Sequence, residues 1–443
     1  MKSIRVRALA SALTALTVIA TASGQALAVT EIQWWHAMGG ELGEKVNAIA
    51  KGFNDSQKDF KVVPIYKGNY SETMTGAIAA FRAKKPPHIV QVFEVGTASL
   101  MAAKGAIYPV YKLMADNKIP FNPKDYLATV TGYYADSSGN MLSMPFNSST
   151  PVLYYNKDLF KKAGLDPQKP PVTWPELEAA AKKLLSSGVK CGFTTGWQSW
   201  VHIENMSAWH NVPIGTKSNG FDGLDTQLVF NQDPILHHIG KMAEWQKSKI
   251  FDYGGRRSDS APKFYTQECA MYMNSSAAYA GIKANAKTFA FGVGKLPYWP
   301  DVKGAPQNSI IGGATLWVLN GQPAGDYKGV GEFFKYLSRA EVQADWHQAT
   351  GYLPITYAAF EATKKAGFYD KNPGTDVAIK QMTGKEPTSN SRGLRFGNFV
   401  QIRDVINEEL ETVWAGKKTA KAALDEAVKR GNALLRKFEA ANK

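Results

Sequence analysis

Three apolar runs dominate the pattern of the chain after position 28, at 31–36, 60–66 and 88–93. Each has the length of a β-strand, and the third is nearly continuous, which is typical of a parallel strand buried on both faces. Between these runs lie longer stretches in which apolar residues recur every three or four positions, as they do on one face of a helix. This alternation of strand and helix predicts an α/β lobe with a mostly parallel sheet.

Turn and capping residues mark the starts of the intervening helices. Gly39-Gly40 separates the first strand from the first helix. We place the start of the second helix at the turn 68–71, with Ser71 as its N-cap, and we place its end at Arg82. In sheets of this kind, ligands bind beyond the carboxyl ends of the strands. Because 34–36, 66–70 and Glu94 fall at those ends, the order of elements alone predicts a binding site there.

Four later segments organise the rest of the chain. The stretch 140–156 joins two apolar pieces through a polar middle, and we interpret it as a crossover from one lobe to a second. The proline-rich piece 161–175 leads into a helix with Thr173 as its N-cap. A second proline-rich connection occupies 297–306, and the composition of 412–443 is helical.

The beginning of the chain is typical of a secretory signal peptide. Lys2, Arg5 and Arg7 precede an apolar stretch, and Ala26-Leu27-Ala28 supplies the small-x-small pattern of a cleavage site. An uncleaved membrane anchor is the alternative, but the apolar stretch is short against the ~20 residues that a spanning helix needs. We therefore expect residues 1–28 to be removed and the mature protein to be periplasmic.

Length then indicates two lobes, because a single core rarely grows beyond about 250–300 residues and 415 of the 443 residues remain. We assign 29–147 plus about 290–345 to lobe one, and 148–289 plus about 346–443 to lobe two. Hydrophobic residues make up 44% of the chain and charged residues 20%, which fits a globular protein.

Net charge and cysteine content exclude few classes of function. The formal charge of +14 falls to about +11 without the first 28 residues, and the basic residues are spread rather than clustered. We therefore expect no nucleic acid partner, while attraction of an anionic solute suits such a field. Cys191 and Cys269 can pair in an oxidising compartment or stay as two buried thiols, and the sequence leaves both open.

Several residue types suited to binding a polar solute are present. Trp197 and Trp200 lie three apart on a segment opened by a glycine, and their rings suit the C–H face of a polyol, although core packing is the alternative for both. Trp34, Trp35 and Trp209 fit packing better. Groups suited to an anion include guanidinium, hydroxyl and backbone N–H groups; they lie at Arg392, Arg395, Arg403, Ser148-Ser149, Ser275-Ser276 and Gly312-Gly313.

Catalytic and metal-binding patterns are poor. The sequence contains no Gly-x-Ser-x-Gly elbow, no His-Glu-x-x-His motif and no phosphate-binding Walker loop. A glycosidase pair of Glu94 and Asp136 is conceivable, yet no pattern brings the two together. We predict that the protein is not an enzyme and that it uses no cofactor and no metal.

These segments together resemble the extracellular solute-binding family of ABC importers, which includes maltose-binding protein, and within it the members that bind glycerol 3-phosphate. The resemblance runs over the whole mature chain, in stretches that are specific in combination: Lys67–Tyr70, Glu94–Thr97, Pro145–Pro151, Gly196-Trp197, Ile310–Gly313, Thr350–Pro354 and Gln401–Arg403. It implies a type II-like periplasmic-binding-protein fold with the ligand cleft between two lobes. It also implies a ligand-binding set at Tyr70, Glu94, Ser149, Trp197, Trp200, Ser275, Gly313, Tyr352 and Arg403.

The resemblance implies capture of sn-glycerol 3-phosphate, and possible capture of glycerophosphodiesters, by a monomer that delivers the ligand to membrane permease subunits. In this reading Arg403 supplies charge to the phosphate, and Glu94 sits at the glycerol end, away from the dianion. Residues 271–274 are bulkier than in the family pattern, so Ser276 is the alternative to Ser275. The competing functions are an oligosaccharide-binding protein of the same fold and a periplasmic phosphodiester or glycoside hydrolase.

Overall fold

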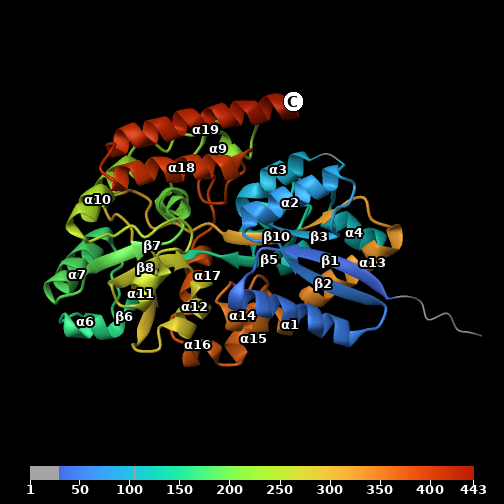
Figure 1. The fold of residues 1–443 in the computed structure, drawn as a ribbon, viewed down its shortest axis with the longest axis horizontal. Coiled ribbons are helices and arrows are strands. Elements are labelled where there is room, and N and C mark those ends of the chain that lie inside the picture. Colours follow the sequence, from blue (N-terminus) through green and yellow to red (C-terminus); the bar gives the residue numbers. More distant parts are fainter. Residues whose placement is uncertain (1–28, 104) are drawn as a thin grey trace, which may run out of the picture.

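Two β-sheets form the framework of the chain, and helices surround both (Figure 1). The computed structural model describes residues 29–103 and 105–443, so the predicted signal peptide, 1–28, lies outside the described residues. The strands of the first sheet are β1 (Thr30–His36), β2 (Phe60–Tyr66), β3 (Ile89–Phe93), β4 (Ile107–Tyr108), β5 (Met144–Ser149) and β10 (Gly312–Leu319). Those of the second are β6 (Pro151–Asn156), β7 (Cys191–Thr195), β8 (Cys269–Ser275) and β9 (Phe291–Gly294).

The first sheet confirms the parallel arrangement predicted for its early strands. Its order is β2-β1-β3-β10-β4, with β1 parallel to both β2 and β3. The late strand β10 pairs antiparallel with β3, β4 and β5, so a segment from far along the chain completes the sheet. The carboxyl ends of β1 and β3 therefore open on the same edge as the glycine-rich start of β10.

Helices cover the first sheet, and the first three of them along the chain begin beside the site. They are α1 (Gly40–Ser56), α2 (Tyr70–Arg82), α3 (Thr97–Ala102), α4 (Val110–Asp116), α5 (Ala128–Tyr134), α13 (Ala324–Leu337) and α14 (Ala340–Thr350). The predicted cap of α2 is wrong by two residues: Asn69, not Ser71, accepts hydrogen bonds from the backbone N–H groups of Ser71 and Glu72, and the Glu72 side chain completes a capping box. Tyr70 is therefore the first residue of a capped helix, which fixes its position.

The chain crosses from the first sheet to the second at one residue. β5 ends at Ser149 and β6 begins at Pro151, so only Thr150 separates strands of different sheets. The crossover predicted in 140–156 is present, and the sheets change at Thr150, while the division into lobes stays a prediction. Likewise β9 pairs with β6 of the second sheet, so the chain returns to the first sheet, at β10, through 295–311.

The second sheet has the order β7-β8-β6-β9, and a disulfide ties two of its strands. β7 is parallel to β8, and Cys191 lies opposite Cys269 in their register, with the Cα atoms 4.5 Å apart. The disulfide that the sequence left open is therefore present. Thr173 caps the helix that packs on β7, as predicted, in a capping box with Glu176.

The second half of the structure carries the remaining helices, two of which form its long C-terminal pair. They are α6 (Lys157–Lys162), α7 (Trp174–Ser186), α8 (Met206–Trp209), α9 (Thr216–Gly220), α10 (Ile235–Ser248), α11 (Ala261–Tyr265), α12 (Ala278–Asn285), α15 (Tyr357–Lys365), α16 (Phe368–Lys371), α17 (Val377–Thr383), α18 (Phe399–Trp414) and α19 (Ala420–Asn442). The stretch 412–443, whose composition is helical, holds the end of α18 and the whole of α19, and these two helices pack against each other above the second sheet (Figure 1).

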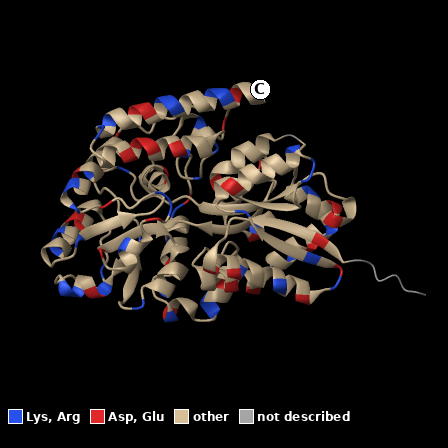
Figure 2. Cartoon of the chain, in the orientation of Figure 1, with Lys and Arg blue, Asp and Glu red and all other residues tan. Residues whose placement is uncertain are grey.

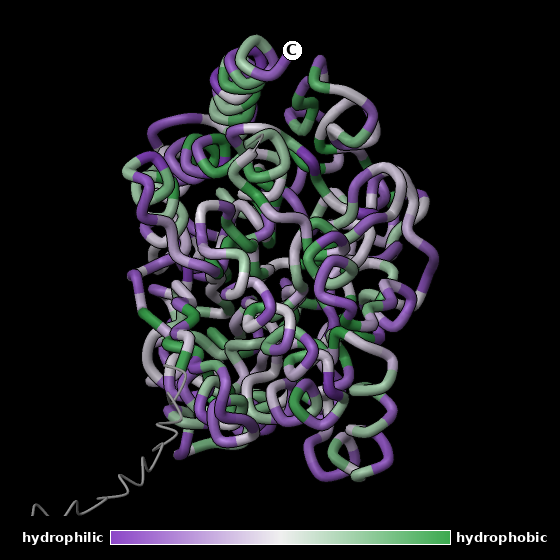
Figure 3. The backbone as a smooth tube through the Cα atoms, turned by 90° about the vertical axis from the view of Figure 1, so that its right-hand side faces the viewer, coloured by the Kyte–Doolittle hydropathy of each residue, from purple (hydrophilic) through white to green (hydrophobic). Residues whose placement is uncertain are grey.

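Charge and hydropathy follow the division between surface and core. Positively charged Lys and Arg and negatively charged Asp and Glu lie along the same outer helices, as Figure 2 shows. In Figure 3 hydrophilic segments lie mostly along the outline of the molecule, and hydrophobic segments are more frequent inside it. Trp34, Trp245 and Trp317 are fully buried. Within residues 29–103 and 105–443, no helix combines the length and apolar character that a membrane crossing requires.

Candidate functional site

A cavity of about 200 Å³ lies between the two halves of the structure. Segments that follow β1 and β3 of the first sheet form one wall, and the end of β8, a turn after β7 and helix α18 form the other. All nine residues predicted from the sequence line it: Tyr70, Glu94, Ser149, Trp197, Trp200, Ser275, Gly313, Tyr352 and Arg403. The structure brings them together; that they contact a ligand stays a prediction.

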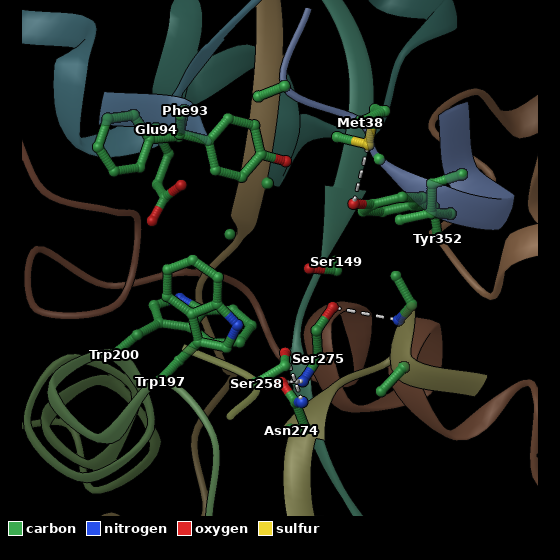
Figure 4. A pocket seen from close by; sticks show the side chains of 18 of the residues that line it. Met38, Phe93, Glu94, Ser149, Trp197, Trp200, Ser258, Asn274, Ser275 and Tyr352 are labelled. Carbon is green, nitrogen blue, oxygen red and sulfur yellow. Dashed lines mark hydrogen bonds between the residues drawn. The ribbon is translucent and has the colours of Figure 1, made fainter. Parts of the chain in front are cut away.

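One side of the cavity carries uncharged hydroxyl donors. Figure 4 shows Ser149, Ser275 and Tyr352 around it, with Tyr352 opposite Glu94. The Ser275 hydroxyl accepts from the backbone N–H of Ala277 at 3.1 Å, which leaves its own proton free to donate. The Tyr352 hydroxyl meets the Met38 thioether, with Sδ 3.9 Å away, and a thioether is a weak acceptor.

Tyr70 adds another oriented phenol to the cavity. Its oxygen accepts from Asn147 Nδ2 at 2.9 Å, and Gln91 Nε2 in turn donates to Asn147 Oδ1 at 2.7 Å. The proton of Tyr70 therefore points away from this chain of donors. Burial raises the pKa of both Tyr70 and Tyr352, so both phenols stay protonated at neutral pH and act as donors.

Two glycines let the backbone of β10 approach the cavity closely. Gly313 has φ +100°, and a Cβ there would stand 1.9 Å from the carbonyl oxygen of Asn147. At Gly312 a Cβ would meet the indole ring of Trp200 at 2.4 Å. Only glycine fits at these two positions, which explains the Gly312-Gly313 pair that the sequence displays between apolar residues.

A buried ion cluster forms the opposite side of the cavity. Arg403 on α18 donates through Nε to Glu204 Oε1 at 2.8 Å and through Nη2 to Glu204 Oε2 at 2.7 Å. The same Nη2 donates to Glu94 Oε1 at 2.7 Å, across the two halves of the structure. The side chains are 7% (Arg403), 4% (Glu94) and 1% (Glu204) exposed, so all three charges are removed from bulk water.

The electrostatics of this cluster follow from burial and mutual contact. Burial raises the pKa of Glu94 above its ordinary value, Arg403 lowers it, and Glu204 raises it again. Burial alone would lower the pKa of Arg403, but the two carboxylates hold it above its ordinary value, so the guanidinium stays charged. Two carboxylates share one guanidinium, and the cluster holds no surplus positive charge.

The ion cluster contradicts one part of the arrangement expected from the sequence, the separation of Arg403 from Glu94, while which ligand group each side chain meets stays a prediction. Arg403 was expected at the phosphate and Glu94 at the far, glycerol end, but the two side chains are hydrogen-bonded and lie at the same end. The physical reason is that a buried guanidinium needs a counter-ion in the protein itself. An arginine already paired with two carboxylates is a poor anchor for a dianion.

The two tryptophans differ in how firmly they belong to the core. Trp200 is 4% exposed, lies against Gly312, and donates from Nε1 to the Ile311 carbonyl at 3.4 Å. Trp197 is partly exposed and adopts φ +49°, with its backbone N–H bonded to the Arg257 carbonyl at 2.7 Å. Figure 4 shows both rings on the same side of the cavity as Glu94.

Other candidates from the sequence fall outside the cavity. Ser276, the alternative to Ser275, does not line it. Arg392 and Arg395 stack on the Phe221 ring instead, and Arg395 also donates to the carbonyls at the end of α5. The packing predicted for Trp34 and Trp209 is confirmed, since both are buried, whereas Trp35 is only partly buried and lies beneath Lys67.

Sequence reasoning missed several lining residues and one supporting residue. Met38, Phe93, Ser258 and Asn274 line the cavity. Met38 and Phe93 stand at the ends of β1 and β3, where the order of elements already pointed. Glu204 does not reach the cavity, and nothing in its local pattern separates it from its buried neighbours.

The catalytic alternative finds no assembled pair. Asp136 accepts from the backbone N–H groups of Ser138 and Asn140 in a tight turn and does not line the cavity that Glu94 faces. Among the residues that the structure describes, no three His, Cys, Asp or Glu side chains gather as metal ligands would.

Comparison with known proteins places the chain in a family. A sequence model of the bacterial extracellular solute-binding proteins matches residues 48–375. The sn-glycerol-3-phosphate-binding periplasmic protein UgpB of Yersinia pseudotuberculosis is 56% identical over 96% of this chain and 96% of its own, and that of Pectobacterium atrosepticum is 54% identical over 97% and 96%.

Solved structures agree on the fold. UgpB from Mycobacterium tuberculosis, in complex with glycerophosphocholine, superposes with a TM-score of 0.78 at 21% identity, covering 92% of this chain and 99% of that one. Maltose-bound MalE3 of T. maritima gives 0.74 at 17% identity, covering 92% and 100%. The fold is therefore the predicted two-lobed α/β fold of such proteins, and the chain belongs to the family of bacterial extracellular solute-binding proteins.

Proposed function

We propose that this chain is the periplasmic solute-binding component of an ABC importer and that it captures sn-glycerol 3-phosphate between its lobes. One observation carries the proposal: a small cavity sets the uncharged hydroxyl groups of Tyr70, Ser149, Ser275 and Tyr352 against a paired carboxylate and guanidinium. The first group suits a phosphate and the second suits vicinal hydroxyls. The names of relatives that are more than 50% identical support the same ligand.

Electrostatics set the direction of the ligand in this proposal. At ~4 Å and an effective dielectric constant of ~20, two unit charges interact by about 4 kcal/mol, so a dianion beside an unneutralised carboxylate is repelled by several times the thermal energy. Arg403 cannot offset this repulsion, because Glu94 and Glu204 already share its charge. The phosphate therefore lies at the hydroxyl side, with Ser149, Ser275, Tyr352 and the backbone at Gly313.

The glycerol part then faces the ion cluster. Glu94 accepts hydrogen bonds from the ligand hydroxyls, and the free edge of the Arg403 guanidinium donates to them. Trp197 covers the C–H face of the polyol with its ring. A site built in this way selects by hydrogen bonds and rejects analogues that leave its buried groups unpaired.

Lobe closure is the second part of the proposal. Adjusting the sequence-based boundaries to the sheets, we propose residues 29–149 plus about 295–345 as lobe one, and 150–294 plus about 346–443 as lobe two. The Glu94–Arg403 hydrogen bond joins the two lobes and stabilises the shut cleft. Closure removes the ligand from water and changes the surface offered to the permease.

The remaining parts of the proposal follow from the pattern of the sequence and from family membership. Cleavage after Ala28 releases the mature protein into the periplasm, where it meets membrane permease subunits as a monomer. It turns over no substrate, uses no cofactor and binds no nucleic acid. Glycerophosphodiesters are a second ligand class, on the condition that the outer side of the phosphate has room for a head group.

A ligand panel tests the proposal. Thermal unfolding and titration calorimetry with glycerol 3-phosphate, glycerophosphocholine, glycerol, inorganic phosphate and maltose separate the candidates. A ligand present at 100 times its Kd raises stability by about 2.7 kcal/mol. We expect glycerol 3-phosphate to stabilise the protein, and glycerol and phosphate alone to fail. Binding of maltose in place of the phosphate ester would favour the oligosaccharide function, and release of glycerol or phosphate would favour a hydrolase.

A further inference from the structure

Glu204 supports the site from behind without facing the ligand. It does not line the cavity, is 1% exposed, and holds Arg403 through both carboxylate oxygens. This two-pronged geometry fixes the plane of the guanidinium. Arg403 can then present its remaining edge to the cavity and one N–H to Glu94.

The local fold holds Glu204 in place. It lies on a π-helical turn, η3 (Trp200–Asn205), a rare conformation that is frequent at functional sites. Asn205 secures this turn: its Nδ2 donates to the Trp200 carbonyl at 3.2 Å, and its Oδ1 accepts from the Ile310 N–H at 3.0 Å. This one turn therefore carries both Trp200, whose ring lines the cavity, and Glu204, whose carboxylate holds Arg403 from behind the cavity.

The charge balance gives Glu204 a consequence for the ligand. With Glu94 alone, Arg403 would form a neutral pair, and any further anion would meet a guanidinium with one counter-ion. With Glu204 as well, two carboxylates oppose one guanidinium, and all three side chains are at most 7% exposed. An anionic group at this end of the cavity then meets net repulsion, while a hydroxyl group does not.

We propose that Glu204 is a specificity-determining positioning residue, which holds Arg403 and makes the end of the cavity beside Glu94 accept hydroxyl groups and reject anionic ones. This proposal rests on the proposed function, since it assumes a phosphate ester with its phosphate at the hydroxyl side. It predicts that glycerol 3-phosphate is preferred over 3-phosphoglycerate, in which a carboxylate replaces the terminal hydroxymethyl group.

Titration calorimetry of both ligands against the wild-type protein and Glu204→Gln tests the proposal. Glutamine keeps the shape and one acceptor for Arg403 but removes the charge. We expect affinity for glycerol 3-phosphate to fall and the ratio of 3-phosphoglycerate affinity to glycerol 3-phosphate affinity to rise by about tenfold, the size of coupling typical of contacting charged groups. An unchanged ratio would overturn the proposal, because a purely structural role lowers both affinities together.

Matched variants separate charge from folding. Glu409→Gln removes another buried carboxylate of the same lobe, one that pairs with Lys418 and Arg430 away from the cavity, and it should leave the ratio unchanged. Glu204→Asp keeps the charge on a shorter side chain and should also keep the ratio; if Glu204→Gln does not fold, a shifted ratio in Glu204→Asp contradicts the proposal. Absence of glycerol 3-phosphate binding by the wild-type protein would refute the proposed function itself, before any variant is compared.

Discussion

Replacement of Arg403 by alanine tests whether the ion cluster is as buried as the structure indicates. The substitution removes three charge-assisted hydrogen bonds and leaves Glu94 and Glu204, which are 4% and 1% exposed, without their counter-ion. Breaking a buried ion pair by removing one partner costs about 3–5 kcal/mol, because a buried charge is left without compensation. The variant should therefore lose ligand binding and also lose stability.

The expected loss translates into a measurable shift of the midpoint of thermal unfolding. For a cooperative unit of ~150–250 residues, each kcal/mol shifts Tm by about 2–4 °C, so we expect a decrease of about 6–20 °C. The Arg256–Glu411 pair provides the matched control. It has the same two-pronged geometry, with Nε 2.7 Å from Oε1 and Nη2 2.8 Å from Oε2, but it is about one-third exposed. Arg256→Ala should cost no more than about 1 kcal/mol, as exposed pairs do.

The pH dependence of the loss identifies its cause. Arg403 lowers the pKa of Glu94, which burial raises, so removing Arg403 leaves that pKa further above its value in the unfolded chain. A group whose pKa is raised in the native state contributes stability at low pH and loses it as pH rises through the folded pKa. The stability deficit of Arg403→Ala relative to wild type should therefore be larger at pH 8 than at pH 5.

Urea unfolding at both pH values measures these differences. It compares the wild type with Arg403→Ala, with Arg256→Ala and with a double variant that carries Arg403→Ala and Glu204→Gln. The double variant removes one stranded charge and should recover part of the lost free energy of unfolding. A deficit below about 1 kcal/mol that does not vary with pH would refute the reasoning, because it is the behaviour of a solvated surface pair.

Two further predictions concern the aromatic and histidine residues. Trp200→Ala should cost about 3–5 kcal/mol of unfolding free energy, as removal of a buried ring does. Trp197→Ala should weaken binding of glycerol 3-phosphate with a smaller loss of stability. Equal losses by urea unfolding would mean that both rings serve the core. Burial lowers the pKa of His202 to about 3 and the pKa values of His36, His210 and His347 to about 4, so stability should be complete above pH 6.5 and decrease as pH falls toward 4, by about 1–2 kcal/mol per histidine at pH 5. Thermal melts between pH 7 and 4.5 check this. The ring of His202 contacts that of His238 at 3.0 Å, and His202→Gln should make stability depend less on pH. An unaltered pH dependence would contradict the lowered pKa of His202.

Local pattern predicted much of the fold because it is set by short-range chemistry. The early strands end within a residue of their predicted positions, since apolar periodicity depends on which face is buried. The cap of α2 was also present in the sequence: Asn69 and Glu72 have the spacing of a capping box, a stronger signal than Ser71 alone. The short strand β9 carries too few residues for a pattern, so its sheet is decided by its partner β6.

The resemblance to the family predicted which residues line the cavity, but the arrangement of the charged side chains could be seen only in the structure. Arg403, Glu94 and Glu204 come from a late helix, a strand end and a π-helical turn, and no spacing along the chain links them. The sequence analysis treats Arg403 as an unpaired cation and therefore places it at the phosphate. Glu204 gave no signal, because every residue of its turn is buried and the turn lacks amphipathic periodicity.

The position of the phosphorus atom in a crystal structure of the protein with glycerol 3-phosphate tests the central claim most directly. The account predicts the phosphate against Ser149, Ser275, Tyr352 and the backbone of Gly313, with the ligand hydroxyls on Glu94 and Arg403. A phosphate bound to the Arg403 guanidinium, with the Arg403–Glu204 bonds broken, would contradict it.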